Sequence, residues 1–148
     1  SRPRVRRATE TPEIPKLQEI KEQQLQAKYN VIQEEAVQEQ PANVPHGTLV
    51  GVSGLYQGAQ ITLKNGEMIR LGRSSENDLI FADQMHVSRQ HCQITWDEAK
   101  GQYKIYDTSS TGSYMNGQEE PLPQNMEVWL GTGVTLDIGD STNRFSLE

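Results

Sequence analysis

From Thr48 to the C-terminus, apolar and polar residues alternate with a period of two, and turn signals interrupt the alternation at short intervals. This pattern is typical of β-strands that bury one face. Asn65-Gly66 and Asn116-Gly117 suit tight turns, because both residue types tolerate positive φ. The pattern predicts an all-β fold, an antiparallel β-sandwich of about eleven strands. We place these strands at about residues 48–53, 59–63, 67–72, 79–81, 91–96, 103–107, 113–115, 120–122, 127–130, 134–138 and 143–147.

The same alternation predicts which side chains of these strands face the core. Together they are numerous enough for the core of one domain. They are Val50, Val52, Ile61, Leu63, Ile69, Leu71, Ile80, Cys92, Ile94, Trp96, Tyr103, Ile105, Val128, Leu130, Val134, Leu136, Ile138 and Phe145.

Residues 1–45 have a different texture. Residues 1–15 are basic and then punctuated by prolines, which indicates an extended segment. Residues 16–40 contain strong helix formers and neither Gly nor Pro, with a narrow apolar stripe that includes Leu25 and Tyr29. We expect this extension to be disordered or helical, with a mostly exposed helix at about 16–40. A break follows at residues 41–47, so we divide the chain into an extension, 1–45, and a folded domain, 46–148.

Two threonines of the extension are candidate phosphorylation sites. Thr9 follows Arg6-Arg7-Ala8, which suits a Ser/Thr kinase that binds arginines upstream of its target. Thr11 precedes Pro12, which suits a proline-directed kinase. The alternative interpretation is a solvated linker or tail.

Composition excludes several functions. The chain has 148 residues and a net charge of −6, all of which falls on residues 46–148. An acidic domain binds nucleic-acid backbone poorly. The single cysteine, Cys92, excludes an internal disulfide and a multi-cysteine metal site, and we expect no metal and no cofactor. No run approaches the ~20 apolar residues of a membrane span, so no direct membrane insertion is expected. We expect a cytoplasmic protein, or part of a larger membrane-associated one.

The stretch from Leu71 to His91 carries the candidate chemistry. Arg73 follows a strand and a glycine, and Ser88 and Arg89 lie in the next loop. An arginine fork donates two parallel hydrogen bonds to a phosphate, and a serine hydroxyl completes the oxygen shell. Two such loops, side by side, would form a small phosphate socket. The alternatives are a surface ion pair of Arg73 with Glu76 or Asp78, a turn-capping role for Ser88 and a solvated Arg89.

We expect no enzymatic activity. Ser88, His91 and Asp83 suggest a catalytic triad, but closeness along the chain is not evidence of one, because triads are recognised by geometry. No phosphate-binding glycine-rich loop of the Walker type and no His/Cys ligand cluster appears.

Three motifs together resemble the signature of the forkhead-associated (FHA) domain family. They are Gly72-Arg73, Ser88-Arg89-Gln90-His91, and the run from Asp107 to Asn116-Gly117. Their order and spacing match, and the resemblance covers about residues 48–147. It implies a β-sandwich that binds phosphothreonine peptides through loops at one end.

The resemblance also implies roles for single residues. Arg73 and Ser88 would contact the phosphate, and Arg89 the phosphate or the peptide. Ser110 and Thr111 would lie in the loop that holds the peptide backbone. His91 would brace the loop beneath the site, Gly72 would also serve as structural support, and Asn116 and Gly117 would shape the following turn.

Thr111 departs from the family, which usually has asparagine there. An amide donates and accepts at once, whereas a threonine hydroxyl makes fewer bonds. The loss of one such bond weakens binding by about 1 kcal/mol. We therefore expect phosphate recognition to survive and peptide affinity to fall.

The resemblance implies a binding module that recruits phosphothreonine-containing partners after a Ser/Thr kinase acts. Its own phosphorylated tail is a further candidate partner: Ile14 lies three positions after Thr11, where FHA domains commonly select a residue. Some bacterial FHA regulators that resemble this arrangement are switched off when their own phosphorylated tail binds the FHA domain. The alternative is a degenerate FHA scaffold, or the cytosolic arm of a larger membrane or secretion-system protein, with contacts that do not depend on phosphate.

Overall fold

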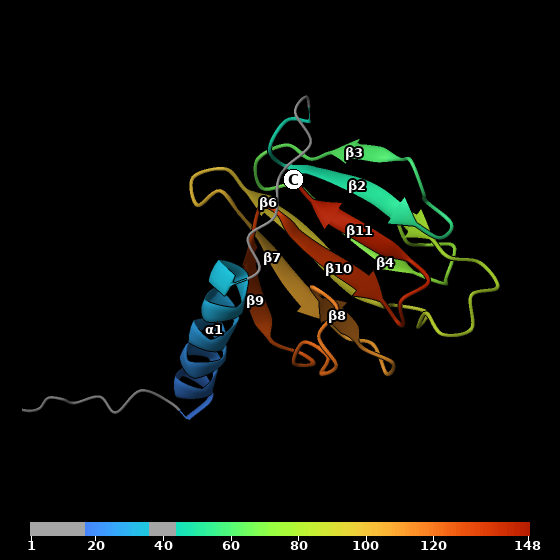
Figure 1. The fold of residues 1–148 in the computed structure, drawn as a ribbon. Helices are drawn as coiled ribbons and strands as arrows, with labels where there is room; N and C mark the ends of the chain where they lie inside the picture. Colours follow the sequence, from blue (N-terminus) through green and yellow to red (C-terminus); the bar gives the residue numbers. More distant parts are fainter. Residues whose placement is uncertain (1–16, 36–43) are drawn as a thin grey trace, which may run out of the picture.

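The computed structural model describes residues 17–35 and 44–148, which form a β-sandwich with one helix along its edge (Figure 1). The expected all-β sandwich is confirmed. The described elements are α1 (Leu17–Glu35), β2 (Thr48–Ser53), β3 (Gln60–Thr62), β4 (Met68–Gly72), β5 (Leu79–Ile80), β6 (Cys92–Asp97), β7 (Gln102–Asp107), β8 (Ser113–Met115), β9 (Glu127–Gly131), β10 (Val134–Ile138) and β11 (Arg144–Leu147).

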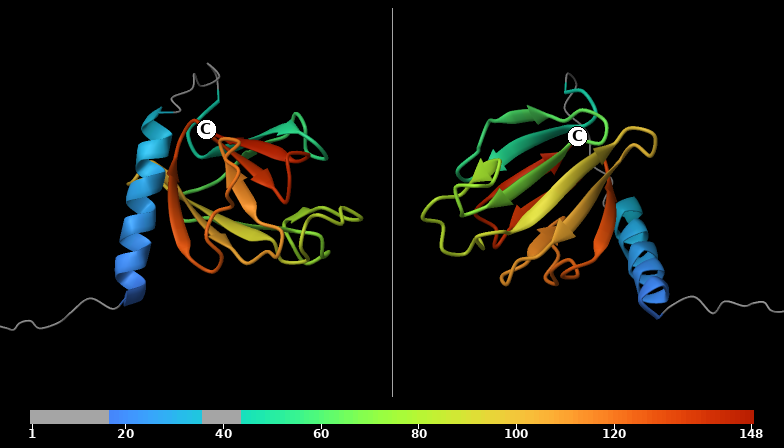
Figure 2. Two further views of the ribbon diagram at one scale, coloured as in Figure 1. Left: turned by 60° about the horizontal axis from the view of Figure 1, so that its bottom comes forward. Right: turned by 180° about the vertical axis from the view of Figure 1, so that it is seen from behind.

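The strands form two layers, each a five-stranded sheet (Figure 2). One sheet has the order β3-β2-β11-β10-β8 and the other β5-β4-β6-β7-β9. Alternate side chains of both sheets meet between the layers, as the burial pattern of β6 and β7 illustrates. The largest fully buried side chains are Tyr103, Phe81, Phe145, Leu49, Leu71, Ile94, Ile105, Met115, Leu130, Leu136, Ile138 and Leu147.

Two details of the expected sandwich are wrong. Residues 120–122 are not a strand, so the described residues contain ten strands. Pro121 has no N–H to donate to a ladder, although Leu122 is buried and bonds Ser113 O at 2.8 Å. The sandwich is also not wholly antiparallel, because the two-residue strand β5 pairs with β4 in parallel.

The register of β2 differs from the expectation by one residue. Leu49 and Gly51 face the core, while Val52 is 44% exposed and Val50 is only partly buried. A side chain at Gly51 would collide with the backbone of Tyr56, since an added Cβ would lie 1.7 Å from its carbonyl oxygen. The Tyr56 ring packs against the ring of Phe81, and the two ring centroids lie 5.2 Å apart.

Helix α1 ends at Glu35 within the described residues, and the rest of the expected range, 36–40, lies outside them. Most of its described side chains are exposed, as expected, but one face docks on the edge strand β9. The side-chain amide of Gln26 donates to Trp129 O at 2.7 Å and accepts from Trp129 N at 2.7 Å. This pair of bonds imitates a neighbouring strand. Tyr29 is 7% exposed beside it.

Residues 1–16 and 36–43 lie outside the described residues, and with them the candidate phosphorylation sites Thr9 and Thr11. The division into 1–45 and 46–148 therefore stays a prediction. Within residues 17–35 and 44–148, no helix has the length and apolarity needed to cross a bilayer.

Candidate functional site

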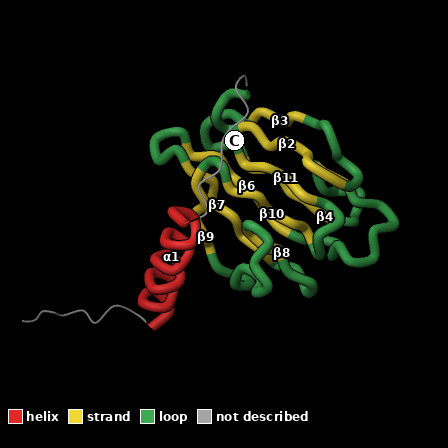
Figure 3. The backbone as a smooth tube through the Cα atoms, viewed as in Figure 1, coloured by secondary structure: helices red, strands yellow, loops and turns green. Residues whose placement is uncertain are grey.

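Three loops meet at one end of the second sheet. β4 ends where β6 begins, because the two strands are antiparallel, and β7 ends beside the start of β6 for the same reason. The loops 73–78, 82–91 and 108–112 therefore share this end of the sandwich. They are among the green connections in Figure 3. The sequence motifs that contain Arg73, Ser88 and Ser110 lie in these loops.

The first two loops are joined by backbone hydrogen bonds. Arg73 N donates to Ser88 O at 2.9 Å, and Ser74 N donates to Arg89 O at 3.2 Å. Glycine is required at position 72 for this approach, since an added Cβ would lie 2.2 Å from Arg89 O. The amide nitrogen of Asn77 donates to both Ser74 O and Arg89 O, at 2.9 and 2.7 Å. These bonds place Arg73 and Ser88 side by side.

Ser88 connects the second loop to the third. Ser110 donates its backbone N–H to Ser88 Oγ at 3.1 Å, and the two hydroxyl oxygens lie 3.3 Å apart. Because Ser88 Oγ accepts this bond, its own proton is free to point at a ligand or at Ser110 Oγ. Ser88 is half-buried and Ser110 is exposed, so both hydroxyls border solvent.

His91 is fully buried beneath these loops. Its Nδ1 accepts the backbone N–H of Ser88 at 3.0 Å, which leaves the proton on Nε2 for the carbonyl of Gly112, 2.8 Å away. Burial is the main cause that lowers the pKa of His91, against the opposing charge of Asp107. The neutral ring therefore braces two loops at once. It does not contact the Ser88 hydroxyl, so the suggested triad with Ser88 and Asp83 is not formed.

The guanidinium of Arg73 is partly exposed, and its Nη1 lies 3.6 Å from the thioether sulfur of Met85. The alternative ion pairs are absent from the described part of the chain. Asp78 lies 3.7 Å from Arg70 Nε instead, and Glu76 accepts a hydrogen bond from Gln90. Arg73 thus keeps its fork available for an anion, as its exposed neighbour in the second loop, Arg89, also does.

Thr111 is exposed, but its hydroxyl is already bonded. It donates to the carbonyl of His86 at 2.7 Å. His86 has a second set of contacts through its ring. Its ring lies 3.4 Å from the Asp140 carboxylate and 3.3 Å from the Asn143 amide. Thr111 is therefore a bridge between the third loop and the second.

Sequence reasoning missed Asp107 and Asn77 as organisers of the loops. Asp107 is 2% exposed and accepts bonds from Ser109 N at 2.8 Å and Ser109 Oγ at 2.6 Å. It also accepts a bond from Ser113 Oγ. The sequence did carry a signal for Asp107, because an aspartate at the start of a loop often accepts the backbone N–H two residues later and forms an Asx-turn. Asn77 gave no signal, since its partners are distant backbone carbonyls.

Asn116 and Gly117 lie beyond β8, outside the cluster of three loops. Both have positive φ, 51° and 71°, and Asn116 Oδ1 accepts the N–H of Thr135 at 3.0 Å. They form the turn after β8. Among the described residues, no group of three His, Cys, Asp or Glu side chains is placed to hold a metal ion.

Known proteins share sequence with the part of the chain that contains the three loops. The FHA domain family profile matches residues 69–139. The curated protein E3 ubiquitin-protein ligase CHFR is 35% identical over 96 residues in Pongo abelii, covering 65% of this chain and 17% of that protein. The Mus musculus protein is 34% identical and is covered to 14%. The chain thus spans less than a fifth of these relatives.

Solved FHA domains share the fold. The FHA domain of an Arabidopsis thaliana hypothetical protein has a TM-score of 0.56 and 26% identity, covering 74% of this chain and 91% of that one. A structure of phosphothreonine-dependent FHA domain interactions has a TM-score of 0.51 and 25% identity, covering 67% and 91%. The FHA domain of CT664 from Chlamydia trachomatis has a TM-score of 0.55 and 23% identity, covering 67% and 92%. The resemblance to the forkhead-associated family is thereby confirmed, since the family profile matches residues 69–139 and solved FHA domains share the fold.

Proposed function

We propose that this domain is a phosphothreonine-peptide binding module that mediates kinase-dependent protein–protein interaction. Arg73 and Ser88 bind the phosphate, Arg89 adds positive charge from the second loop, and Ser110 and Thr111 contact the peptide backbone. Gly72 and His91 support the loops, and Asn116 and Gly117 shape the turn after β8. The domain acts by binding and not by catalysis.

One observation carries the proposal: Ser88 Oγ accepts the N–H of Ser110 at 3.1 Å, and Arg73, whose backbone N–H donates to Ser88 O at 2.9 Å, has a guanidinium without a carboxylate partner among the described residues. The hydroxyl proton of Ser88 and the fork of Arg73 then form a set of donors with no acceptor of opposite charge. A phosphate dianion matches that set, because charge-assisted bonds to it are strong and bidentate. Interactions of a similar FHA domain are phosphothreonine-dependent, which supports the same ligand class.

The test is calorimetric titration of the unphosphorylated chain with a phosphothreonine peptide and with the same peptide after dephosphorylation. We expect saturable binding of the first and a loss of at least about 100-fold for the second, since two or more charge-assisted bonds disappear. Equal affinity for both peptides would refute the proposal. Ser88→Ala should lower the affinity for the phosphorylated peptide and leave the affinity for the dephosphorylated peptide unchanged.

We further propose that the chain's own tail, phosphorylated at Thr11 or Thr9 by a Ser/Thr kinase, occupies this site. Both threonines have kinase-compatible neighbours, and Ile14 supplies an aliphatic residue after Thr11. Because the tail belongs to the same chain, its effective concentration at the site can reach about the millimolar range, so even weak binding fills the site. Phosphorylating the tail should then block an external phosphopeptide, and Thr11→Ala with Thr9→Ala should restore its binding. Unchanged binding after phosphorylation would refute this autoregulation.

The alternative function is a degenerate scaffold, within a cytoplasmic protein or the cytosolic arm of a larger membrane or secretion-system protein. One observation favours it: the hydroxyl of Thr111 already donates to His86 O at 2.7 Å, so it has no proton left for a peptide carbonyl. The availability of Arg73 and Ser88 opposes it. Two results together would support the scaffold. The folded wild-type chain would bind no phosphopeptide, and the Arg73→Ala variant would still bind a protein partner.

A further inference from the structure

His86 lies in the second loop, two residues before Ser88, and its ring faces the connection between β10 and β11, residues 139–143. Its Nε2 lies 3.3 Å from the amide nitrogen of Asn143 and 3.4 Å from a carboxylate oxygen of Asp140. An amide nitrogen donates hydrogen bonds, whereas a carboxylate accepts them. One ring nitrogen therefore has two neighbours that require opposite roles of it.

The side chain of Asn143 faces His86 with its nitrogen because other contacts fix its orientation. Asn143 is 1% exposed, and its Oδ1 accepts the backbone N–H of Leu55 at 2.9 Å. Its Nδ2 then lies 3.3 Å from Gln84 Oε1 and has a second hydrogen for His86 Nε2. The His86 ring must accept this bond, so the neutral ring carries its proton on Nδ1.

Protonation of the ring reverses the role of Nε2. A charged imidazole donates from both nitrogens, so Nε2–H and the Asn143 amide would face each other as two donors. Asp140 supplies an acceptor beside the ring, and its side chain is 49% exposed. Desolvation raises the pKa of this carboxyl, but hydrogen bonds from Thr142 and the charge of His86 lower the pKa overall, so the carboxylate is ionised where a histidine takes up a proton.

The fold places one carboxylate against the His86 ring. The connection 139–143 contains no charged residue besides Asp140, and the third loop and residues 54–55 contain none. Of the carboxylates in the described residues, Asp140 is the one within ion-pair distance of the ring. The other charged or titratable groups of the first two loops are Arg73, Glu76, Asp78, Asp83, Arg89 and His91. His91 lies beneath, and its pKa is lowered mainly by burial and to a smaller extent by the charge of His86.

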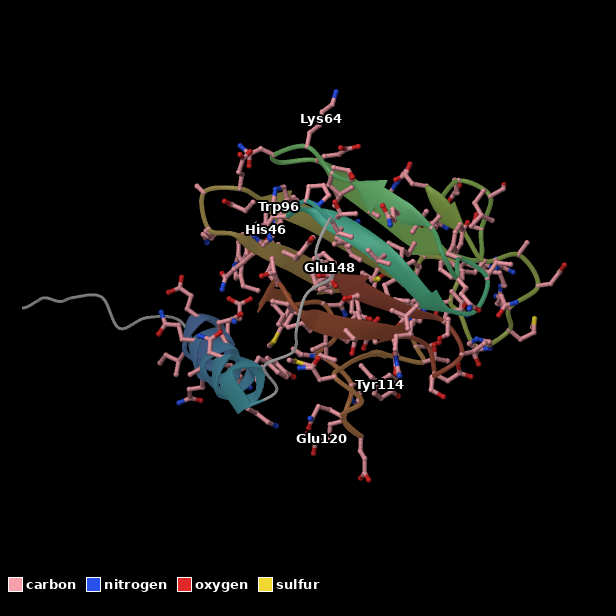
Figure 4. All side chains as sticks on the ribbon, turned by 45° about the horizontal axis from the view of Figure 1, so that its top comes forward. His46, Lys64, Trp96, Tyr114, Glu120 and Glu148 are labelled. Atoms are coloured by element: carbon pink, nitrogen blue, oxygen red, sulfur yellow. The ribbon has the colours of Figure 1, made fainter. Side chains whose placement is uncertain are left out.

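The backbone of His86 joins the second loop to the third. Its carbonyl accepts the Thr111 hydroxyl at 2.7 Å, and Tyr114, labelled in Figure 4, donates its own hydroxyl to Thr111 O at 3.0 Å. The same carbonyl passes close to Gly139, where an added Cβ would lie 2.2 Å from it. A change in how the His86 ring is held therefore acts on the loop that carries Ser88.

We propose that His86 is a proton-sensitive positioning residue of the phosphate-binding loop, tied to Asn143 when its ring is neutral and to Asp140 when the ring is protonated. A buried amide holds the neutral ring. A half-exposed carboxylate holds the charged ring less firmly, because water and salt compete there. Phosphopeptide affinity therefore falls as His86 takes up its proton. This effect on affinity rests on the proposed phosphothreonine binding, whereas the exchange of partners does not.

The exchange of partners is tested by nitrogen NMR of the full unphosphorylated chain with isotope-labelled histidine and asparagine, from about pH 8 to about pH 5. We expect the neutral His86 ring to carry its proton on Nδ1, and the side-chain amide signal of Asn143 to shift as the ring is protonated. In Asp140→Asn, which keeps an oxygen for the N–H of Thr142, the ring should take up its proton at lower pH. A neutral ring protonated on Nε2, an Asn143 signal that does not follow the titration, or unchanged proton uptake in the variant would overturn the proposal.

The effect on the site is tested by titrating one phosphothreonine peptide against the wild type and His86→Gln at about pH 7.5 and about pH 5.5. Glutamine offers Asn143 an acceptor that does not titrate. The peptide phosphate changes charge in the same range, with a pKa of about 6, so the two chains are compared at each pH. The affinity of the wild type relative to that of the variant should fall about threefold on acidification.

His46→Gln is the matched control. His46 is exposed and precedes β2, at the end of the sandwich away from the three loops, and Figure 4 labels it. The His46→Gln variant should follow the wild type at both pH values. Thermal unfolding at each pH establishes that the variants are folded, and the NMR titration of the wild type needs neither of them.

The outcomes separate the two proposals. If the peptide binds but the relative affinity does not change with pH, or changes equally for His46→Gln, then His86 does not position the loop and the phosphate reader stands. If no phosphopeptide binds the wild type, the proposed function fails, and the NMR titration decides the exchange of partners by itself.

Discussion

His91 Nδ1 accepts the backbone N–H of Ser88 at 3.0 Å, so a buried neutral imidazole holds the residue proposed to meet the phosphate. The other ring nitrogen donates to Gly112 O at 2.8 Å, next to Thr111. One side chain thereby sets the spacing of two loops. Protonation would place a donor where Nδ1 must accept and would break the bond to Ser88.

This relationship predicts a pH dependence of stability. The pKa of His91 is lowered in the fold, mainly by burial, so the unfolded chain binds the proton more readily. The contribution is complete above the ordinary histidine pKa of about 6.5 and is lost as the pH falls below it. Chemical denaturation of the wild type and His91→Ala across this range measures the difference. The variant should be less stable by about 3 kcal/mol at neutral pH, with a smaller loss on acidification. A difference that does not change with pH would contradict the assignment.

A second prediction concerns the contact at Gly72. Gly72→Ala places a methyl group 2.2 Å from Arg89 O and 2.6 Å from the Asn77 amide nitrogen. The first two loops must then separate, which should cost more than about 2 kcal/mol of stability and weaken phosphopeptide binding. Gly66→Ala is the control, because it has open space and only the strain of φ 79°. Equal stability loss in both variants, measured by denaturation, would contradict the packing argument.

A third prediction addresses the departure at Thr111. Thr111→Asn restores the amide that the family resemblance implies, and its nitrogen can still donate to His86 O. We expect peptide affinity to rise about fivefold, the value of one additional hydrogen bond. Thr111→Val, which keeps the shape and loses the hydroxyl, should not strengthen binding. Calorimetry with one phosphopeptide compares the three chains, and equal affinity of the asparagine variant and the wild type would contradict this account.

A fourth prediction concerns the docking of α1. Gln26→Ala removes both hydrogen bonds to the backbone of Trp129 and exposes the edge of β9. We expect a loss of about 1–3 kcal/mol, because two partly buried backbone groups of Trp129 lose these hydrogen bonds. Gln24→Ala, at an exposed position of the same helix, is the matched control and should change stability little. Equal denaturation midpoints for the two variants would mean that the helix does not stabilise the domain.

The sequence predicted the sandwich and the loops well, because period-two alternation and Asn-Gly turns are local signals. It was wrong about the register of β2, where Val50 and Val52 are as apolar as the inward Leu49. The backbone of the loop after β2 explains that register, because the carbonyl oxygen of Tyr56 lies 1.7 Å from a Cβ added at Gly51, so only glycine fits there. The parallel pairing of β5 gave no signal, since two residues cannot display a periodicity.

The site, like the fold, has features that the sequence predicted and features that it did not. The placement of Arg73, Ser88 and Ser110 in neighbouring loops was an expectation from the resemblance of their motifs to the FHA family. The partners of Asn77 and His86 were not predicted, because their bonds run to backbone groups and loops far along the chain. The docking of Gln26 was also hidden, since a glutamine on a helix predicts exposure. Its amide bonds the backbone of β9 because β9 is the last strand of its sheet.

The central claim is tested most directly by titrating a phosphothreonine peptide against Arg73→Ala and Arg70→Ala. Both variants remove one positive charge near the end of β4, but Arg70 is paired with Asp78 and lies outside the three-loop cluster. The account predicts that Arg73→Ala loses at least about 100-fold in affinity, while Arg70→Ala changes it by less than about threefold. Equal, small losses in the two folded variants would contradict the phosphate reader.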